Sequence, residues 1–197
     1  MNSPSSSTHT VVVLSGVNGS GKTRYVETRP QLPSLIVRVD DYFTSDGVYK
    51  YDPKSLANAH RECFRKFIEG CQSGLRDIVV DNTNTTVEEI SPYVLGGEAY
   101  GYYVRIVTLM ARTSQQGLYD VLECCASRNV HGVRPHVVLA QHKRIMSRQL
   151  PTSWLHSFVP IDIECTEART PLVAPAPQMA SEQWVPKALQ SSDERKR

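Results

Sequence analysis

Short runs of β-branched and other apolar residues alternate along the chain with segments whose apolar positions recur every three or four residues. Such runs are typical of buried strands, and the second spacing is typical of amphipathic helices. The predicted strands cover residues 11–14, 35–39, 78–80 and 102–110. The predicted helices cover residues 22–28, 53–69, 87–100, 118–126 and 135–146. Because strands alternate with helices, the pattern predicts an α/β fold with a mostly parallel sheet covered on both faces.

The alternation occupies the middle of the chain and leaves two polar ends. Residues 1–10 are rich in serine and are predicted to be a flexible lead. Residues 164–197 contain few large apolar residues and repeated prolines, so they are predicted to be a flexible tail. A length of 197 residues fits one domain over residues 11–163 with these two ends attached.

The segment between the first predicted strand and the first predicted helix reads G-V-N-G-S-G-K-T and matches the phosphate-binding pattern G-x-x-x-x-G-K-[ST]. Glycines let the backbone fold so that its N–H groups point at phosphate oxygens. Lys22 would add a positive charge at the β- and γ-phosphates, and the Thr23 hydroxyl would bind magnesium. We therefore expect ATP and Mg²⁺ to bind here. The predicted nucleotide-binding residues are Gly16, Asn18, Gly19, Ser20, Gly21, Lys22 and Thr23.

Acidic residues follow the next two predicted strands: Asp40 and Asp41 after the second, and Asp81 after the third. Ligands of such sheets bind beyond the carboxyl ends of the strands, so these carboxylates should converge on the phosphate loop. Asp40 is predicted to be the general base for an acceptor hydroxyl. Asp81 is predicted to hold magnesium, directly or through water. Asp41 is interpreted as a helix cap or a supporting group. This arrangement in a short chain favours a kinase that acts on a free hydroxyl.

Arginines between the last two predicted helices are candidates for a lid over the triphosphate. Arg128 is predicted to stabilise the charge that develops on the transferring phosphoryl group. Arg134, Arg144 and Lys143 are interpreted as solvated charges on a helix face. His131 is interpreted as a capping or turn residue, although it could also touch phosphate.

Composition narrows the class of protein only slightly. The chain has 22 basic and 20 acidic residues, and this near-neutral balance neither requires nor excludes nucleic acid. Its five cysteines form no C-x-x-C pair, which favours a reducing compartment, and we expect a cytoplasmic location. We expect no membrane association, since no apolar run approaches the roughly 20 residues of a membrane helix.

Four segments together resemble the polynucleotide-kinase-like branch of P-loop kinases, over about residues 11–148: the phosphate loop, D-D-Y-F at 40–43, D-N-T-N at 81–84 and R-N-V-H-G at 128–132. The resemblance implies a five-stranded sheet in the order 2-3-1-4-5 with a helical lid. It also implies an ATP-dependent kinase with a nucleic-acid hydroxyl as acceptor, in which Lys22, Asp40 and Arg128 are catalytic. The residues implied at the acceptor are Asp41, Tyr42, Phe43, Asn82 and Asn84.

The sequence leaves open which hydroxyl would be phosphorylated. Phe43 stands where an end-phosphorylating relative has an arginine, so the hydroxyl could belong to a 5′ end or to the hydroxymethyl group of a modified base in DNA, as in DNA modification. Tyr42, Phe43, Tyr49 and Tyr51 could stack on such a base or pack the loop down. Two alternatives are a kinase for a nucleoside, sugar or antibiotic, and an ATP-binding interaction module whose tail, with Trp184, docks a partner.

Overall fold

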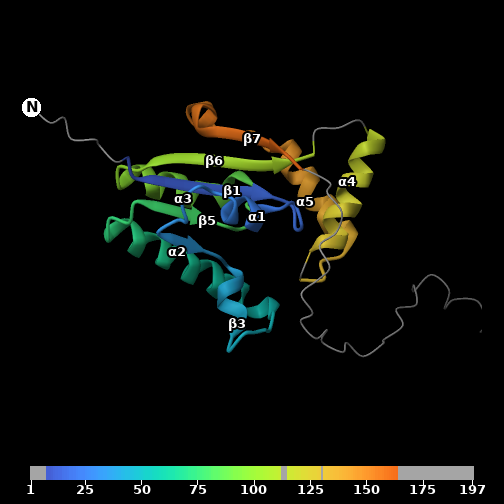
Figure 1. The fold of residues 1–197 in the computed structure, drawn as a ribbon, viewed down its shortest axis with the longest axis horizontal. Helices are drawn as coiled ribbons and strands as arrows, with labels where there is room; N and C mark the ends of the chain where they lie inside the picture. Colours follow the sequence, from blue (N-terminus) through green and yellow to red (C-terminus); the bar gives the residue numbers. More distant parts are fainter. Residues whose placement is uncertain (1–7, 112–114, 130, 164–197) are drawn as a thin grey trace, which may run out of the picture.

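Five parallel strands form the central sheet of the computed structural model, which describes residues 8–111, 115–129 and 131–163 (Figure 1). The strands are β1 (Thr10–Gly16), β2 (Leu35–Val37), β5 (Asp77–Val80), β6 (Tyr103–Met110) and β7 (Phe158–Asp162). Their order in the sheet is β2-β5-β1-β6-β7, and every neighbouring pair is parallel. Counted along the chain within this sheet alone, that order is 2-3-1-4-5, as expected.

Helices cover both faces of the sheet. They are α1 (Lys22–Glu27), α2 (Leu56–Gln72), α3 (Val87–Ala99), α4 (Gln115–Arg128) and α5 (Pro135–Ser147). Alternate side chains of β1 point to opposite faces. Val11 and Val13 join one apolar cluster with residues of α2 and α3, whereas Val12 and Leu14 join a second cluster with residues of α1, α4 and α5. The result is the predicted three-layer α/β sandwich.

The predicted strands and helices are all present, with shifted ends. The second strand was expected over 35–39 but stops at Val37, and the chain then enters a 3₁₀ helix, η1 (Asp40–Phe43). The segment after η1 forms a small hairpin of β3 (Thr44–Ser45) and β4 (Val48–Tyr49), which the pattern of apolar residues did not predict. Two further 3₁₀ helices are η2 (Pro53–Ser55) and η3 (Thr152–Ser157).

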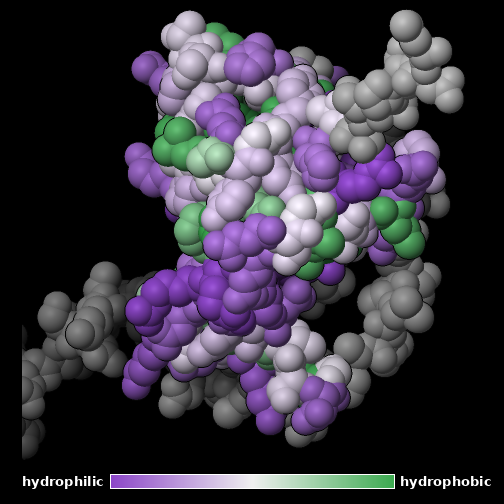
Figure 2. All heavy atoms as spheres, turned by 90° about the vertical axis from the view of Figure 1, so that its left-hand side faces the viewer, coloured by the Kyte–Doolittle hydropathy of each residue, from purple (hydrophilic) through white to green (hydrophobic). Residues whose placement is uncertain are grey.

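The phosphate loop lies at the carboxyl ends of the strands, beside α4 and α5 (Figure 1). Figure 2 shows the opposite end of the molecule, where hydrophilic side chains cover much of the visible face and apolar ones form only small groups. No helix among the described residues is long and apolar enough to cross a membrane. Of the two predicted flexible ends, residues 1–7 and 164–197 lie outside the described residues. Thr10 was placed in the flexible lead, but it is the first residue of β1.

Candidate active site at the carboxyl ends of the strands

The phosphate loop joins β1 to α1 and depends on two glycines in left-handed conformations. Gly19 has φ 74° and Gly21 has φ 97°, a region that costs other residues energy. A Cβ added to Gly19 would also lie 1.9 Å from the carbonyl oxygen of Cys125 in α4. The loop therefore packs directly against α4, and position 19 accepts only glycine on both grounds.

Replacing Gly19 with alanine should destabilise the protein and weaken ATP binding. Gly47 provides a matched control, because it has φ 76° but no atom within 4 Å of an added Cβ. Gly47→Ala should lower the free energy of unfolding by about 1 kcal/mol through backbone strain alone. Gly19→Ala should lower it by about 1–3 kcal/mol more, because the added Cβ also clashes with α4. Urea unfolding and ATP titration of both variants would check this, and equal losses would contradict the close packing of the loop against α4.

Lys22 supplies the positive charge of the site. Its Nζ donates hydrogen bonds to the carbonyl oxygens of Gly16 and Val17, both at 3.0 Å. Burial lowers the pKa of Lys22, and the strongest opposing influence is the Asp81 carboxylate, with Asp40 among the weaker ones. The structure thus brings Lys22 within electrostatic reach of two carboxylates that the sequence places on other strands.

Asp81 lies at the end of β5, and its side chain is only 4% exposed. Its Oδ2 accepts a hydrogen bond from Arg38 Nε at 2.9 Å, and Arg38 follows the neighbouring strand β2. Thr23 lies exposed in the first turn of α1. Magnesium in phosphate sites takes one or two protein oxygens together with phosphate oxygens, so these two residues fit its donor set. The described residues contain no cluster of three or more His, Cys, Asp or Glu that would hold a metal by itself.

Asp40 begins η1, and its side chain is 50% exposed. The Tyr49 hydroxyl donates to Asp40 Oδ1 at 3.1 Å, and His131 Nε2 lies 3.3 Å from Oδ2. Burial, together with the Asp40 carboxylate, raises the pKa of Tyr49 well above its usual value, so this hydroxyl keeps its proton and donates. A carboxylate oxygen has two lone pairs, so each oxygen of Asp40 can still accept a proton from a further hydroxyl.

The other predicted acceptor residues surround Asp40 in different ways. Asp41 is exposed, and partial burial is the main cause that raises the pKa of its carboxyl group. Phe43 is buried and meets the rings of Tyr42, Tyr49 and Tyr51 edge to face. These three tyrosines remain exposed. Phe43 therefore packs the loop down, whereas the tyrosines stay available to a ligand.

Asn82 and Asn84 hold strand ends together. Asn82 Oδ1 accepts a hydrogen bond from the Val39 backbone N–H at 2.8 Å. The buried Asn84 has φ 41° and donates from Nδ2 to the Leu14 carbonyl oxygen at 2.7 Å. The D-N-T-N segment thus lies in the site, and the observed contacts of its two asparagines shape the backbone there.

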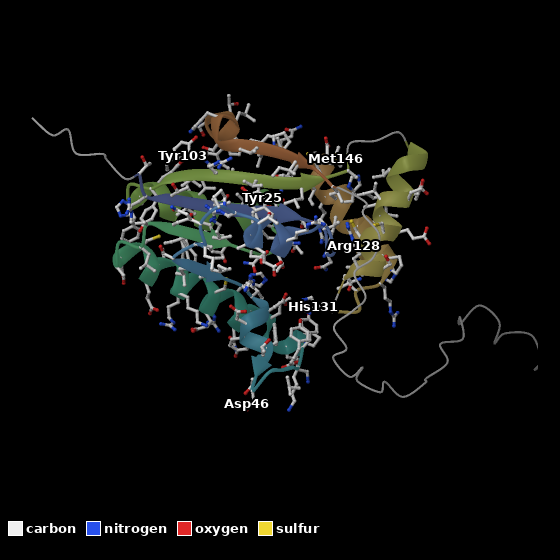
Figure 3. The ribbon with its side chains drawn as sticks, viewed as in Figure 1. Tyr25, Asp46, Tyr103, Arg128, His131 and Met146 are labelled. Atoms are coloured by element: carbon white, nitrogen blue, oxygen red, sulfur yellow. The ribbon has the colours of Figure 1, made fainter. Side chains whose placement is uncertain are left out.

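The α4–α5 connection carries the predicted lid residues. Arg128 ends α4, and Figure 3 places it beside the end of the sheet that bears the phosphate loop. Asn129 fixes the turn that follows, since its Oδ1 accepts from the Val133 N–H at 2.6 Å. His131 lies in a turn, as interpreted, and the structure also places its Nε2 3.3 Å from Asp40 Oδ2. Arg144 is more than a solvated charge, because its Nε donates to Thr85 Oγ1 at 3.0 Å.

Two polar residues at α5 were missed by sequence reasoning. Gln141 is buried, and its Oε1 accepts from the Asn18 N–H of the phosphate loop at 3.0 Å. Arg148, just after α5, donates to Ser15 Oγ and Thr108 Oγ1, both at 2.6 Å. Burial lowers the pKa of Arg148 to about 10. The available signal was their spacing: Gln141 shares the buried face of α5 with Val138 and Ile145, and Arg148 continues this spacing just past the end of the helix.

Residues 11–149 match the AAA_33 family, described as an AAA domain. Among curated relatives, human NEDD4-binding protein 2 is 32% identical over 162 residues, which are 80% of this chain and 9% of that protein. The chain thus spans about a tenth of the length of that relative.

Two solved structures share the fold. A sugar kinase from Janibacter sp. HTCC2649 is 15% identical with a TM-score of 0.51, covering 79% of this chain and 86% of that one. A putative kinase from Chloroflexus aurantiacus is 16% identical with a TM-score of 0.52, covering 79% and 88%. At these identities the likeness concerns the fold, which is a kinase-like P-loop fold.

Proposed function

Because the chain belongs to the AAA domain family and has a kinase-like P-loop fold, we propose that it is an ATP- and magnesium-dependent kinase whose acceptor is a nucleic-acid hydroxyl. The observation that carries the proposal is the Asp40 carboxylate, half exposed and within electrostatic reach of Lys22 at the phosphate loop. Lys22 and Asp40 both follow the carboxyl ends of strands, so in the proposed reaction the triphosphate would bind Lys22 and the alcohol would lose its proton to Asp40.

In this reaction a bond forms between the acceptor oxygen and the γ-phosphorus, and the bond from that phosphorus to the β–γ bridging oxygen breaks. Asp40 accepts the proton of the hydroxyl, and Lys22 stabilises negative charge on the β- and γ-phosphate oxygens. Arg128 adds positive charge at the transferring group. Bound Mg²⁺ neutralises further phosphate charge, and Thr23 and Asp81 are the residues that would hold it.

A nucleic-acid acceptor is supported by the surroundings of Asp40. Tyr49 contacts Asp40, and Tyr42 and Tyr51 pack on the same Phe43 ring as Tyr49. All three tyrosines are exposed, and exposed aromatic rings are surfaces on which bases stack. The motif set D-D-Y-F, D-N-T-N and R-N-V-H-G points to the same class of acceptor. The hydroxyl would be that of a 5′ end or the hydroxymethyl group of a modified base.

A small-molecule acceptor is the second candidate, and the charge of the acceptor segment favours it. Residues 40–52 contain four aspartates and one lysine, so a polyanion bound there meets repulsion. One of the solved structures with this fold is a sugar kinase. A neutral nucleoside or sugar would avoid the repulsion.

Incubation with γ-labelled ATP and Mg²⁺ would separate these functions. The acceptors are 5′-hydroxyl DNA, 5′-hydroxyl RNA, DNA containing 5-hydroxymethylcytosine, thymidine and glucose. We expect label in one of the polymers. Label in thymidine or glucose alone would favour the small-molecule kinase. ATP binding without transfer to any acceptor would overturn the proposed activity.

A further inference from the structure

Two aromatic side chains from separate parts of the fold contact each other beside Asp40, the predicted general base. Tyr49 comes from the β3–β4 hairpin, and His131 comes from the connection between α4 and α5. Their ring centroids are 4.7 Å apart with an interplanar angle of 47°. In Figure 3, His131 lies at the hairpin that bears Asp46 at its tip. Tyr49 contacts one carboxylate oxygen of Asp40 and His131 contacts the other, so an acceptor hydroxyl bound at Asp40 lies next to these two side chains.

Tyr49 belongs to a supported aromatic surface. The buried ring of Phe43 lies beneath it at a centroid distance of 6.3 Å, and Tyr51 contacts the same Phe43 ring at 5.1 Å. The side chains of Tyr49 and Tyr51 remain 37% and 52% exposed. Phe43 therefore anchors two rings that stay partly exposed to a ligand, and this arrangement suits stacking.

The charge around these rings selects among ligands. The acceptor segment is acidic, which disfavours a phosphate or carboxylate in contact with it. A neutral planar ring can stack on Tyr49 without that penalty, and the edge of His131 offers a hydrogen-bonding nitrogen. A simple polyol would gain little from either feature.

We propose that Tyr49 and His131 form a subsite for a planar heteroaromatic ring of the acceptor, held beside the hydroxyl that Asp40 deprotonates. This inference rests on the proposed kinase activity and adds one requirement to it: the acceptor presents a nucleobase, either within DNA or, in the second candidate function, in a free nucleoside. Tyr49 then has two roles: its hydroxyl positions the Asp40 carboxylate, and its ring selects the acceptor.

Two variants of Tyr49 separate these roles. Tyr49→Phe keeps the ring and removes the hydroxyl, whereas Tyr49→Leu removes the ring. We expect Tyr49→Leu to raise the KM for a ring-bearing acceptor about tenfold or more, while Tyr49→Phe keeps that KM within about threefold and lowers kcat. The KM for ATP should stay unchanged in both. His131→Leu should also raise the acceptor KM, which provides a second variant on another element.

Tyr103→Leu is the matched control, because Tyr103 is an exposed tyrosine at the start of β6, away from the carboxyl ends of the strands (Figure 3). It should leave both KM values and kcat unchanged. A Tyr49→Leu variant with unaltered acceptor KM, or a protein that phosphorylates glucose as well as it phosphorylates thymidine or hydroxymethylated DNA, would overturn the subsite.

Equilibrium dialysis of labelled thymidine and of a hydroxymethylcytosine oligonucleotide keeps this test independent of turnover. If either probe binds to the wild type but not to Tyr49→Leu, the subsite is supported even where no phosphate is transferred. In that case only the proposed activity fails. If neither probe binds while ATP-dependent transfer to another acceptor proceeds, the subsite is wrong and the kinase activity stands. The two probes also distinguish a nucleoside from a base within DNA.

Discussion

Lys22→Ala should abolish measurable ATP-dependent phosphoryl transfer, with a loss of at least about 10²–10³ in rate. The Lys22 ammonium is the only side-chain cation within the predicted phosphate loop, and its Nζ already lies 3.0 Å from two carbonyl oxygens of that loop. Without it, the loop loses its charge for the β- and γ-phosphates while the sheet beneath is unaffected. Transfer from labelled ATP measures the effect.

Lys143→Ala serves as the control for Lys22→Ala, since Lys143 is an exposed lysine on α5. It should keep the wild-type rate. Transfer at near wild-type rate by Lys22→Ala would show that the nucleotide phosphates bind elsewhere.

Asp40→Asn should lower kcat by about 10²–10⁴, the usual contribution of a general base, and leave ATP binding nearly unchanged. The amide keeps the shape of the side chain, and its oxygen can still accept a hydrogen bond from Tyr49, but it cannot take a proton from the acceptor. Initial rates and ATP titration in the presence of magnesium give both quantities.

The control for this variant is Asp46→Asn. Asp46 lies at the tip of the β3–β4 hairpin, which follows η1, and it has φ 51°, a conformation that asparagine tolerates well. Its replacement should change neither rate nor binding. If Asp40→Asn instead abolished binding of the magnesium nucleotide, Asp40 would hold the metal and the roles assigned to Asp40 and Asp81 would be exchanged.

The local pattern of apolar, polar and glycine residues was sufficient to predict most of the fold. The apolar run 11–14, the glycines after it and the helical residues from Lys22 lie next to one another in the sequence, so their arrangement as β1, loop and α1 could be predicted. The segment of β7 was not recognised. It is a sheet-edge strand with an exposed Pro160 in its middle and no fully buried residue, so it lacks the continuous apolar run of the central strands.

The core of the candidate site followed from one topological rule. Parallel strands end at the same edge, so Asp40 and Asp81 had to approach Lys22, and their influence on its pKa agrees with that. The partners of Gln141 and Arg148 could not be predicted from the sequence, because these contacts depend on how α5 packs against the phosphate loop and β6. The contact of His131 with Asp40 depends in the same way on where the α4–α5 connection lies.

In the proposed site, a cation in the phosphate loop faces a proton-accepting carboxylate across the path of an alcohol. The decisive measurement is a crystal structure of the protein with Mg²⁺ and a non-hydrolysable ATP analogue. We expect the γ-phosphate to contact Lys22 Nζ and to be open on the side of Asp40, with space for one hydroxyl between them. A γ-phosphate that points away from Asp40, or a backbone segment that fills the space between them, would contradict it.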